Sequence, residues 1–202
     1  MNLLTQNSKL KKTSEHFNKR VFNFGIPAYK SNTGLVTCPL AGECVKFCYA
    51  KKGAYIWSNV KPAFEKRLEA TQKNNFVQIM IEEVKKKKAD FVRVHDSGDY
   101  YSKEYLLKWF AIAEALPNVK FYSYTNNINM IKKLKSIPIN YDFIFSDSGK
   151  QKQLINKTTD RHTKIFKTKL ELERAGYKDT SDFDLYATRW FNNSNNVGLI
   201  IH

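Results

Sequence analysis

Three short apolar runs separated by helical patterns place the strongest constraint on how this sequence can fold. The runs FVRVH (91–95), KFYSYT (120–125) and DFIFS (142–146) have the composition of buried strands. Amphipathic patterns at 102–116 and 128–137 predict the helices that connect them. Strands joined in this way pair in parallel, so we expect their carboxyl ends to meet at one edge of a sheet. Open sheets and barrels of this α/β class carry their sites at that edge.

The rest of the chain gives further local predictions. At 202 residues it has the length of one domain, so we expect a single domain over 1–202, with 1–20 as an arm or short helix. The other predictions are one strand with loops at 21–37, helices at 44–54, 61–73, 76–88 and 163–176, and strands at 184–190 and 197–201.

Three cysteines within the eleven residues 38–48 are the clearest candidate metal site. Cys38, Cys44 and Cys48 occur in TCPLAGECVKFCYA, on a Pro/Gly loop that leads into a helical pattern. An odd number of cysteines argues against a disulfide framework in a cytoplasmic chain. Closely spaced thiols are suited to a soft metal centre, which is either an iron–sulfur cluster or zinc; unliganded cysteines are the third interpretation.

The two metal centres differ in what completes them. Structural zinc needs a fourth protein ligand, and none of the histidines has the usual finger spacing from the cysteines: His16, His95, His162, His202. A cluster of four irons held by three thiolates leaves one iron free to bind another molecule. The cluster interpretation therefore predicts a reactive site.

Polar segments follow each of the three central strands. They are HDSGD at 95–99, YTNN at 124–127 and FSDSG at 145–149. Each also has a simpler interpretation, since SGD can be a strand-to-helix loop, TNN a helix cap and SDSG a turn. His95 is either a functional group at the strand edge or a buried hydrogen-bonding residue.

The loop at 38–48 that carries the cysteines, called the cysteine loop below, and these three segments resemble motifs of the radical S-adenosylmethionine superfamily in their order and spacing. The aromatic Phe47 precedes the last cysteine, HDSGD stands where that superfamily has a Gly-Gly-Glu-like segment, YTNN is similar to its Thr-Asn-Gly, and FSDSG to its Ser-x-Asp-Gly. More narrowly, CPxAxxCxxxCYA followed by RxHxSGD resembles a phage-encoded family known as gene product eighty-eight. The resemblance covers residues 30–150. Both cysteine intervals are longer than in the common CX3CX2C loop, and Asp99 replaces a glutamate.

The resemblance implies an incomplete parallel (β/α) barrel and an enzyme that cleaves S-adenosylmethionine reductively. Cys38, Cys44 and Cys48 would hold a [4Fe–4S] cluster, whose open iron would take the cofactor's amino and carboxylate groups. An external electron donor would reduce the cluster. The other residues that the resemblance assigns are His95 and Asp99 as catalytic groups, Ser97, Gly98 and Asp99 on the methionine part, and Thr125, Asn126, Ser146 and Asp147 along the ribose and substrate side.

Charge adds an expectation about partners. The sequence has 34 Lys and Arg against 19 Asp and Glu, a net charge of +15. Such an excess attracts polyanions, although lysines can also serve only as a solubilising surface. We expect an anionic substrate, with a nucleic acid or a nucleotide as the first hypothesis. The sequence has no apolar run of membrane-spanning length and no secretory signal, which predicts a cytoplasmic protein with no membrane partner.

Two other functions fit the same features. One is a non-catalytic module, stabilised by zinc or by a cluster, that binds nucleic acid through lysines and stacked aromatic rings. The other is a cluster-bearing adaptor or redox sensor that never cleaves the cofactor.

Overall fold

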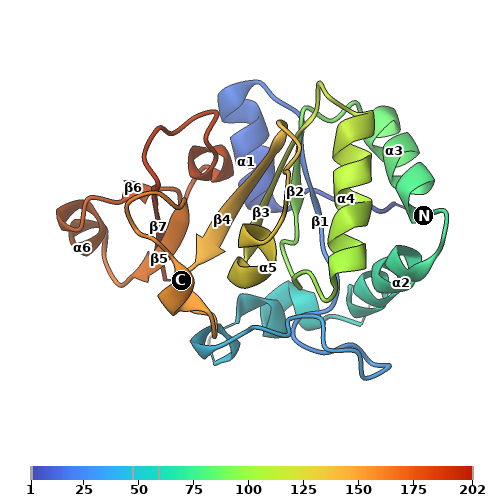
Figure 1. Cartoon of the computed structure of the whole chain (residues 1–202), viewed down its shortest axis with the longest axis horizontal. Helices are drawn as coiled ribbons and strands as arrows, with labels where there is room; N and C mark the ends of the chain where they lie inside the picture. Colours follow the sequence, from blue (N-terminus) through green and yellow to red (C-terminus); the bar gives the residue numbers. More distant parts are fainter. Residues whose placement is uncertain (1, 47, 59, 202) are drawn as a thin grey trace.

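A parallel sheet of seven strands forms the centre of the computed structural model, which describes residues 2–46, 48–58 and 60–201 (Figure 1). The strand order is β1-β2-β3-β4-β5-β7-β6, and every neighbouring pair is parallel. The sheet curls into a half-barrel, which confirms the expected α/β class and the incomplete barrel. The strands are β1 Val21–Phe24, β2 Phe91–Val94, β3 Lys120–Thr125, β4 Tyr141–Ser146, β5 His162–Phe166, β6 Lys178–Asp179 and β7 Asn196–Ile200.

Helices cover both faces of the sheet. Figure 1 shows α4 and α5 in front of it, α2 and α3 beside β1, and α1 behind it. The larger apolar core lies on the α2–α5 side, where Phe24, Trp109 and Phe121 are fully buried. The helices are α1 Ser8–Phe17, α2 Lys61–Gln72, α3 Phe76–Lys87, α4 Lys103–Ala115, α5 Ile128–Lys132 and α6 Lys169–Arg174.

Local sequence explains where the helices begin and end. The side chains of Asn7 and Ser102 accept hydrogen bonds from the backbone in the first turns of α1 and α4. Pro62 stands at the start of α2, where its missing N–H costs nothing. Lysines 85–87 occupy the last turn of α3, where cations offset the negative end of the helix dipole.

The N-terminal segment belongs to the fold. Leu3 and Leu4 are buried in the larger core, and Thr5 forms an antiparallel bridge with Asn23 of β1. Leu10 of α1 is fully buried in a second apolar cluster on the inner face of the half-barrel, together with Tyr122. From Asn2 onward, the expected arm is therefore a segment bridged to β1 and followed by the docked helix α1.

Three predictions of local structure near the cysteines and the C-terminus are wrong. The helix expected at 44–54 is a series of single 3₁₀ turns: η1 Glu43–Val45, η2 Tyr49–Lys51 and η3 Gly53–Ile56. The helix expected at 163–176 begins instead with β5, because residues 162–166 pair along their whole length with β7 and at two positions with β4. Only its second half forms a helix, α6.

The strand expected at 184–190 is the 3₁₀ turn η5, Asp184–Ala187. Asp184 is fully buried and pairs with cations on two other elements, and these ion pairs outweigh the local preference of DLYATRW for a strand. The helix expected at 128–137 ends early, at Lys132, as α5. None of the helices formed by the described residues combines the length and the apolar character that crossing a membrane requires.

We predict that Leu10→Ala lowers the free energy of unfolding by about 2–5 kcal/mol, because it leaves a cavity between α1 and the sheet. Leu107→Ala is the matched control, since Leu107 lies on α4 with 44% of its surface exposed. That variant is expected to change stability by less than about 0.5–1 kcal/mol. Urea unfolding followed by circular dichroism measures both, and equal losses would show that α1 is not docked.

Candidate functional site

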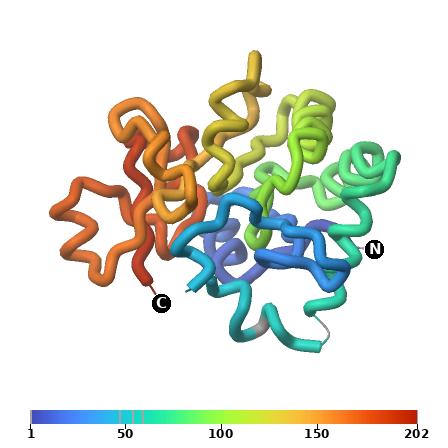
Figure 2. The backbone as a smooth tube through the Cα atoms, turned by 60° about the horizontal axis from the view of Figure 1, so that its bottom comes forward, coloured from blue at the N-terminus to red at the C-terminus, as the bar shows by residue number. Residues whose placement is uncertain are grey.

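The cysteine loop lies across the carboxyl ends of the strands. It follows β1, and Figures 1 and 2 show the blue-to-cyan segment passing over the edge where the parallel strands end. Cys38, Cys44 and Cys48 are free and half-buried. The backbone N–H of Tyr29 donates to the Cys38 sulfur across 3.3 Å, and Cys48 precedes η2. Phe47, the aromatic of the sequence motif, lies outside the described residues.

Backbone hydrogen bonds tie this loop to the ends of two strands. The N–H of Asp99, after β2, donates to the carbonyl of Thr37 across 2.9 Å. The N–H of Lys150, after β4, donates to the carbonyl of Leu40 across 2.9 Å. Cys38 therefore lies between two points at which the loop is fixed to the sheet.

Two glycines make the contact with the β4 end close. A Cβ on Gly42 would lie 2.7 Å from the backbone oxygen of Ser148, so only glycine fits there without a shift. A Cβ on Gly149 would overlap the side chain of Asn126, which follows β3. The cysteine loop thus packs against the backbone of the β4 end, and the β4 end packs against the Asn126 side chain after β3.

Burial controls the acidity of the thiols. Burial, helped by the nearby Asp99 carboxylate and the other two thiols, raises the pKa of Cys38 to about 12, while the Tyr29 N–H opposes the rise. Burial also raises the pKa of Cys48, while hydrogen bonds from the backbone N–H groups of Ala50 and Lys51 lower it. Without a bound cation these groups are protonated, so a metal would have to displace their protons.

The described histidines have other partners. His16 stacks on Phe183 with ring centroids 4.0 Å apart, and His162 contacts Tyr177 and the Asp160 carbonyl. Within 2–46, 48–58 and 60–201, no three His, Cys, Asp or Glu side chains converge as a single-ion site requires. His202, the remaining zinc candidate, is outside the described residues.

Asp99 joins the predicted site residues of β2 and β3. Its carboxylate accepts from the Thr125 hydroxyl (2.7 Å), the Asn126 N–H (2.9 Å) and the Tyr100 N–H (2.8 Å). Burial raises the pKa of Asp99, while the Asn126, Thr125 and Tyr100 donors oppose that rise. The structure therefore brings Asp99, Thr125 and Asn126 together as one buried junction.

The remaining predicted residues have different surroundings. Ser97 is buried and accepts the Ile26 N–H at its carbonyl, and Gly98 has a positive φ of 84° against Ile26. Ser146 ends β4, and Asp147 forms an ion pair with Lys157 across 3.4 Å. Ser146 and Asp147 share the strand edge, but no polar contact links them to Asp99 in the described part of the chain. Their roles stay predictions.

His95 faces the aromatic core. Its Nε2 lies 2.9 Å from the Tyr105 hydroxyl, and its ring packs edge-on against Tyr100. Burial lowers the pKa of His95 to about 3, so its ring is neutral at physiological pH. This matches the interpretation of His95 as a buried hydrogen-bonding residue, and a catalytic role stays a prediction.

Asp96 belongs to the HDSGD segment, but the sequence analysis predicted no role for it. The Asp96 carboxylate accepts from the Asn23 amide (2.7 Å) and the Tyr55 hydroxyl (3.1 Å), and the Tyr49 hydroxyl donates to its carbonyl. Oδ1 is buried without a hydrogen-bond partner. Burial raises the pKa of Asp96 to about 6. The signal available in the sequence was a carboxylate in a polar segment, two residues after the buried strand that ends at Val94.

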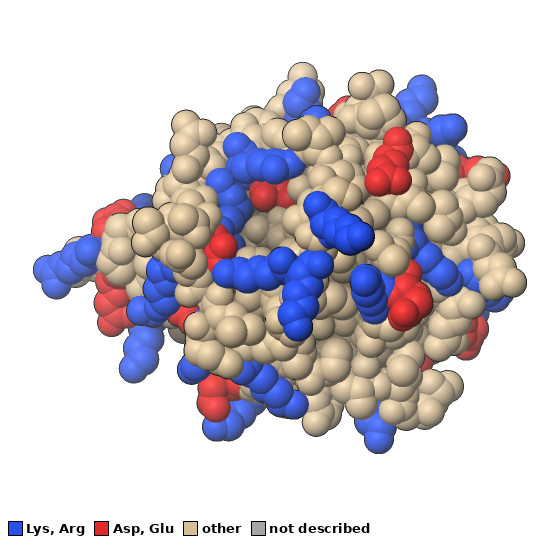
Figure 3. All heavy atoms as spheres, in the orientation of Figure 1, with Lys and Arg blue, Asp and Glu red and all other residues tan. Residues whose placement is uncertain are grey.

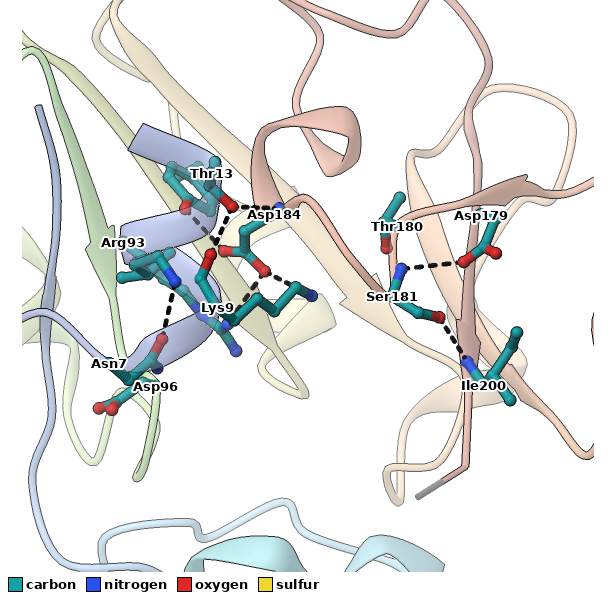
Figure 4. Close-up of polar contacts among 12 residues, drawn as sticks. Asn7, Lys9, Thr13, Arg93, Asp96, Asp179, Thr180, Ser181, Asp184 and Ile200 are labelled. Atoms are coloured by element: carbon teal, nitrogen blue, oxygen red, sulfur yellow. Dashed lines mark hydrogen bonds and ion pairs between the residues drawn. The ribbon is translucent and has the colours of Figure 1, made fainter. Parts of the chain in front are cut away.

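A buried ion-pair network on the inner face was also missed. Asp184 pairs with Arg93 of β2 (3.1 Å) and Lys9 of α1 (3.0 Å), and accepts from the Tyr122 hydroxyl (2.6 Å) (Figure 4). Burial alone would raise the pKa of Asp184, but Arg93 and Lys9 hold it at about 2. The buried Asp96 carboxylate also attracts Arg93, which lowers the pKa of Asp96 against the effect of burial. No local motif indicates contacts that span 91 and 175 residues.

Comparison with known proteins identifies the family. A family model described as Gene product 88 matches residues 1–199. The chain belongs to this family. No curated protein and no solved structure matches it. The narrower of the two resemblances is therefore confirmed, and it extends beyond residues 30–150. Membership of gene product 88 in the radical S-adenosylmethionine superfamily stays a prediction.

We predict that Gly42→Ala in this gene product 88 protein lowers the free energy of unfolding by about 1–3 kcal/mol, because its Cβ meets backbone that cannot turn aside. The loop should also separate from the β4 end, so iodoacetamide should alkylate Cys44 faster in the folded variant. Gly53→Ala is the control, since a Cβ there meets nothing within 4 Å. It should cost only about 1–2 kcal/mol for its left-handed backbone and leave alkylation unchanged.

Asp96 predicts a pH dependence of stability. Its pKa is raised in the folded state, so between about pH 4 and pH 6 the folded protein binds more protons than the unfolded chain. The contribution of Asp96 to stability is therefore present below pH 4 and lost as pH rises to about 6, by up to roughly 3 kcal/mol. Asp96→Asn should remove this loss, whereas the exposed Asp182→Asn should retain it. Urea unfolding across pH 4–7 measures the difference, and parallel profiles would contradict the assignment.

Proposed function

We propose that this gene product 88 protein is an iron–sulfur enzyme of the radical S-adenosylmethionine type. Cys38, Cys44 and Cys48 would hold a [4Fe–4S] cluster, and S-adenosylmethionine would bind its open iron. One observation carries the proposal: three free cysteines share a loop whose backbone is fixed to the carboxyl ends of β2 and β4. That edge is where parallel α/β folds bind cofactors and substrates.

The donor set supports a cluster more than zinc. Thiolates are the usual ligands of iron–sulfur clusters, and three of them leave one iron without a protein ligand. A zinc site completed by histidine has less support, because His16, His95 and His162 are engaged elsewhere. When bound, the cluster would supply the electron that breaks a carbon–sulfur bond of S-adenosylmethionine.

The chain's own residues would bind and orient the cofactor. Asp99 is held at a fixed position by three donors and borders Cys38, so its carboxylate can accept a hydrogen bond from an ammonium group at the open iron. Thr125 and Asn126 hold the Asp99 carboxylate. Ser146 and Asp147 extend the polar edge toward the substrate side. These roles are proposals for an enzyme that also needs an electron donor.

Charge supports an anionic substrate. The net charge is +15, and Figure 3 shows Lys and Arg side chains spread over one face and gathered around a hollow near its centre. Positive potential of this kind concentrates anions near the site. A nucleotide or nucleic acid is the proposed substrate class.

A second candidate function has its own observation. The aromatic cluster around α1 and η5 carries cations: Lys178 Nζ lies 4.5 Å from the Tyr186 ring centroid, and Arg189 lies 5.2 Å from that of Trp190. Aromatic rings interleaved with cations are typical of single-stranded nucleic-acid binding. This favours the alternative of a metal-stabilised nucleic-acid-binding protein without turnover.

The test is anaerobic reconstitution with iron and sulfide, followed by dithionite and S-adenosylmethionine. We expect about four irons per chain and formation of 5′-deoxyadenosine, detected by chromatography. Cys48→Ala should lose the iron and the product. Lys46→Ala is the matched control, because Lys46 stands between Cys44 and Cys48 in the sequence and its side chain is 76% exposed; it should retain both the iron and the product.

The other outcomes separate the alternatives. A fully loaded cluster without cofactor cleavage would reject the enzyme and favour an adaptor or redox sensor. Zinc in anaerobically purified, colourless protein, together with salt-sensitive binding of DNA or RNA, would favour the nucleic-acid-binding protein.

A further inference from the structure

A cavity of about 300 Å³ lies beside the cysteine loop. Its walls come from the loop after β1, the turns after Cys48, the start of α2 and the end of β2. Ala50, two residues beyond Cys48, is part of the wall. The side chains that matter for its chemistry are Lys30, Lys51, Tyr55, Lys61, Phe64 and Ser97. This volume is at the lower end of the range for small-molecule sites.

The cavity wall has an excess of positive charge. Lys30, Lys51 and Lys61 face one carboxylate, that of Glu65, which already accepts the Asn32 N–H across 2.8 Å. None of these three lysines forms an ion pair with another residue in the part of the chain that the structure describes. Lys51 Nζ lies 4.8 Å from the Tyr29 ring centroid, but a ring carries no negative charge to neutralise it. Ammonium groups without a carboxylate partner around a cavity favour an anionic ligand.

The same cavity has an aromatic wall. The Tyr55 and Phe64 ring centroids lie 5.5 Å apart, with 41° between the ring planes. Behind Phe64 lies Arg67, only 5% exposed, whose guanidinium carbon is 4.7 Å from the Phe64 ring centroid. Its Nε is buried without a hydrogen-bond partner. The wall therefore offers two tilted aromatic rings with a buried cation next to Phe64.

We propose that this cavity binds a nucleoside monophosphate, with its phosphate at Lys51 and Lys61 and its base against Tyr55 and Phe64. This ligand class combines an anionic group for the lysines with an aromatic ring for Tyr55 and Phe64. A bare anion would contact only the lysines, and a neutral aromatic molecule would contact only the rings. Binding of the nucleotide does not depend on the proposed function; only the role of this nucleotide as the substrate rests on it. It specifies the anionic substrate as a nucleotide bound next to Cys48.

The test is isothermal titration of the full, reconstituted protein with AMP, with adenosine and with inorganic phosphate. AMP should bind saturably, and each of the two fragments should bind at least about tenfold more weakly. The double variant Lys51→Ala/Lys61→Ala should weaken AMP binding by about tenfold or more, because it removes charged partners of the phosphate. Lys85→Ala/Lys86→Ala removes the same charge from the end of α3 and should change the affinity less than about twofold.

A third variant tests the position of the cavity. Ile56 is 58% exposed at the wall, so Ile56→Glu costs little packing and places a negative charge beside the phosphate; it should also weaken AMP binding. Absence of saturable AMP binding, or equal losses in the two lysine double variants, would overturn the proposal. The titration contains no reductant and no S-adenosylmethionine, so its failure leaves cofactor cleavage untouched. If cluster assembly fails, the same titration is carried out on the full chain as purified, because the lysines and aromatic rings of the cavity do not include a cysteine.

Discussion

The packing of the cysteine loop against the strand ends is the constraint on which the candidate site depends. The backbone N–H of Asp99 donates to the Thr37 carbonyl, and the backbone N–H of Lys150 donates to the Leu40 carbonyl. Cys38 lies between these two hydrogen bonds, so its position is fixed relative to the sheet. Gly42 allows the loop to approach the β4 end at backbone distance. A metal site built on a loop needs such support, because ligand geometry must be kept within fractions of an ångström.

Buried charge is the second organising feature. Asp184 connects α1, β2 and the C-terminal segment, and its three partners compensate the cost of burying a carboxylate. Asp96 is less well compensated, since one of its oxygens is buried without a partner. Native proteins leave few such atoms, so each one needs a structural or functional explanation. Asp96 also contacts Tyr55, which lines the cavity beside the cysteine loop.

Some predictions depended on local pattern and are confirmed for that reason. The strands at 91–95 and 120–125 and the helix at 102–116 have periodic apolar residues and a Ser102 cap, which tertiary structure has no reason to override. The predictions for 163–176 and 184–190 were wrong because contacts with distant residues determine the secondary structure there. The first segment pairs with β7, and Asp184 in the second pairs with Arg93 and Lys9. Pairing over long sequence distances leaves no periodic trace in the segment itself.

By itself, the sequence determined the α/β class, the parallel order of the central strands, the clustering of three cysteines and the family motifs around HDSGD. These follow from spacing along the chain, which a reader of the sequence sees directly. Only the tertiary structure decided that Asp99 meets Thr125 and Asn126, that His95 turns into the aromatic core, and that three lysines surround a cavity next to Cys48. Those outcomes depend on the curl of the sheet and on the path of the loop across its edge, which bring together side chains far apart in sequence.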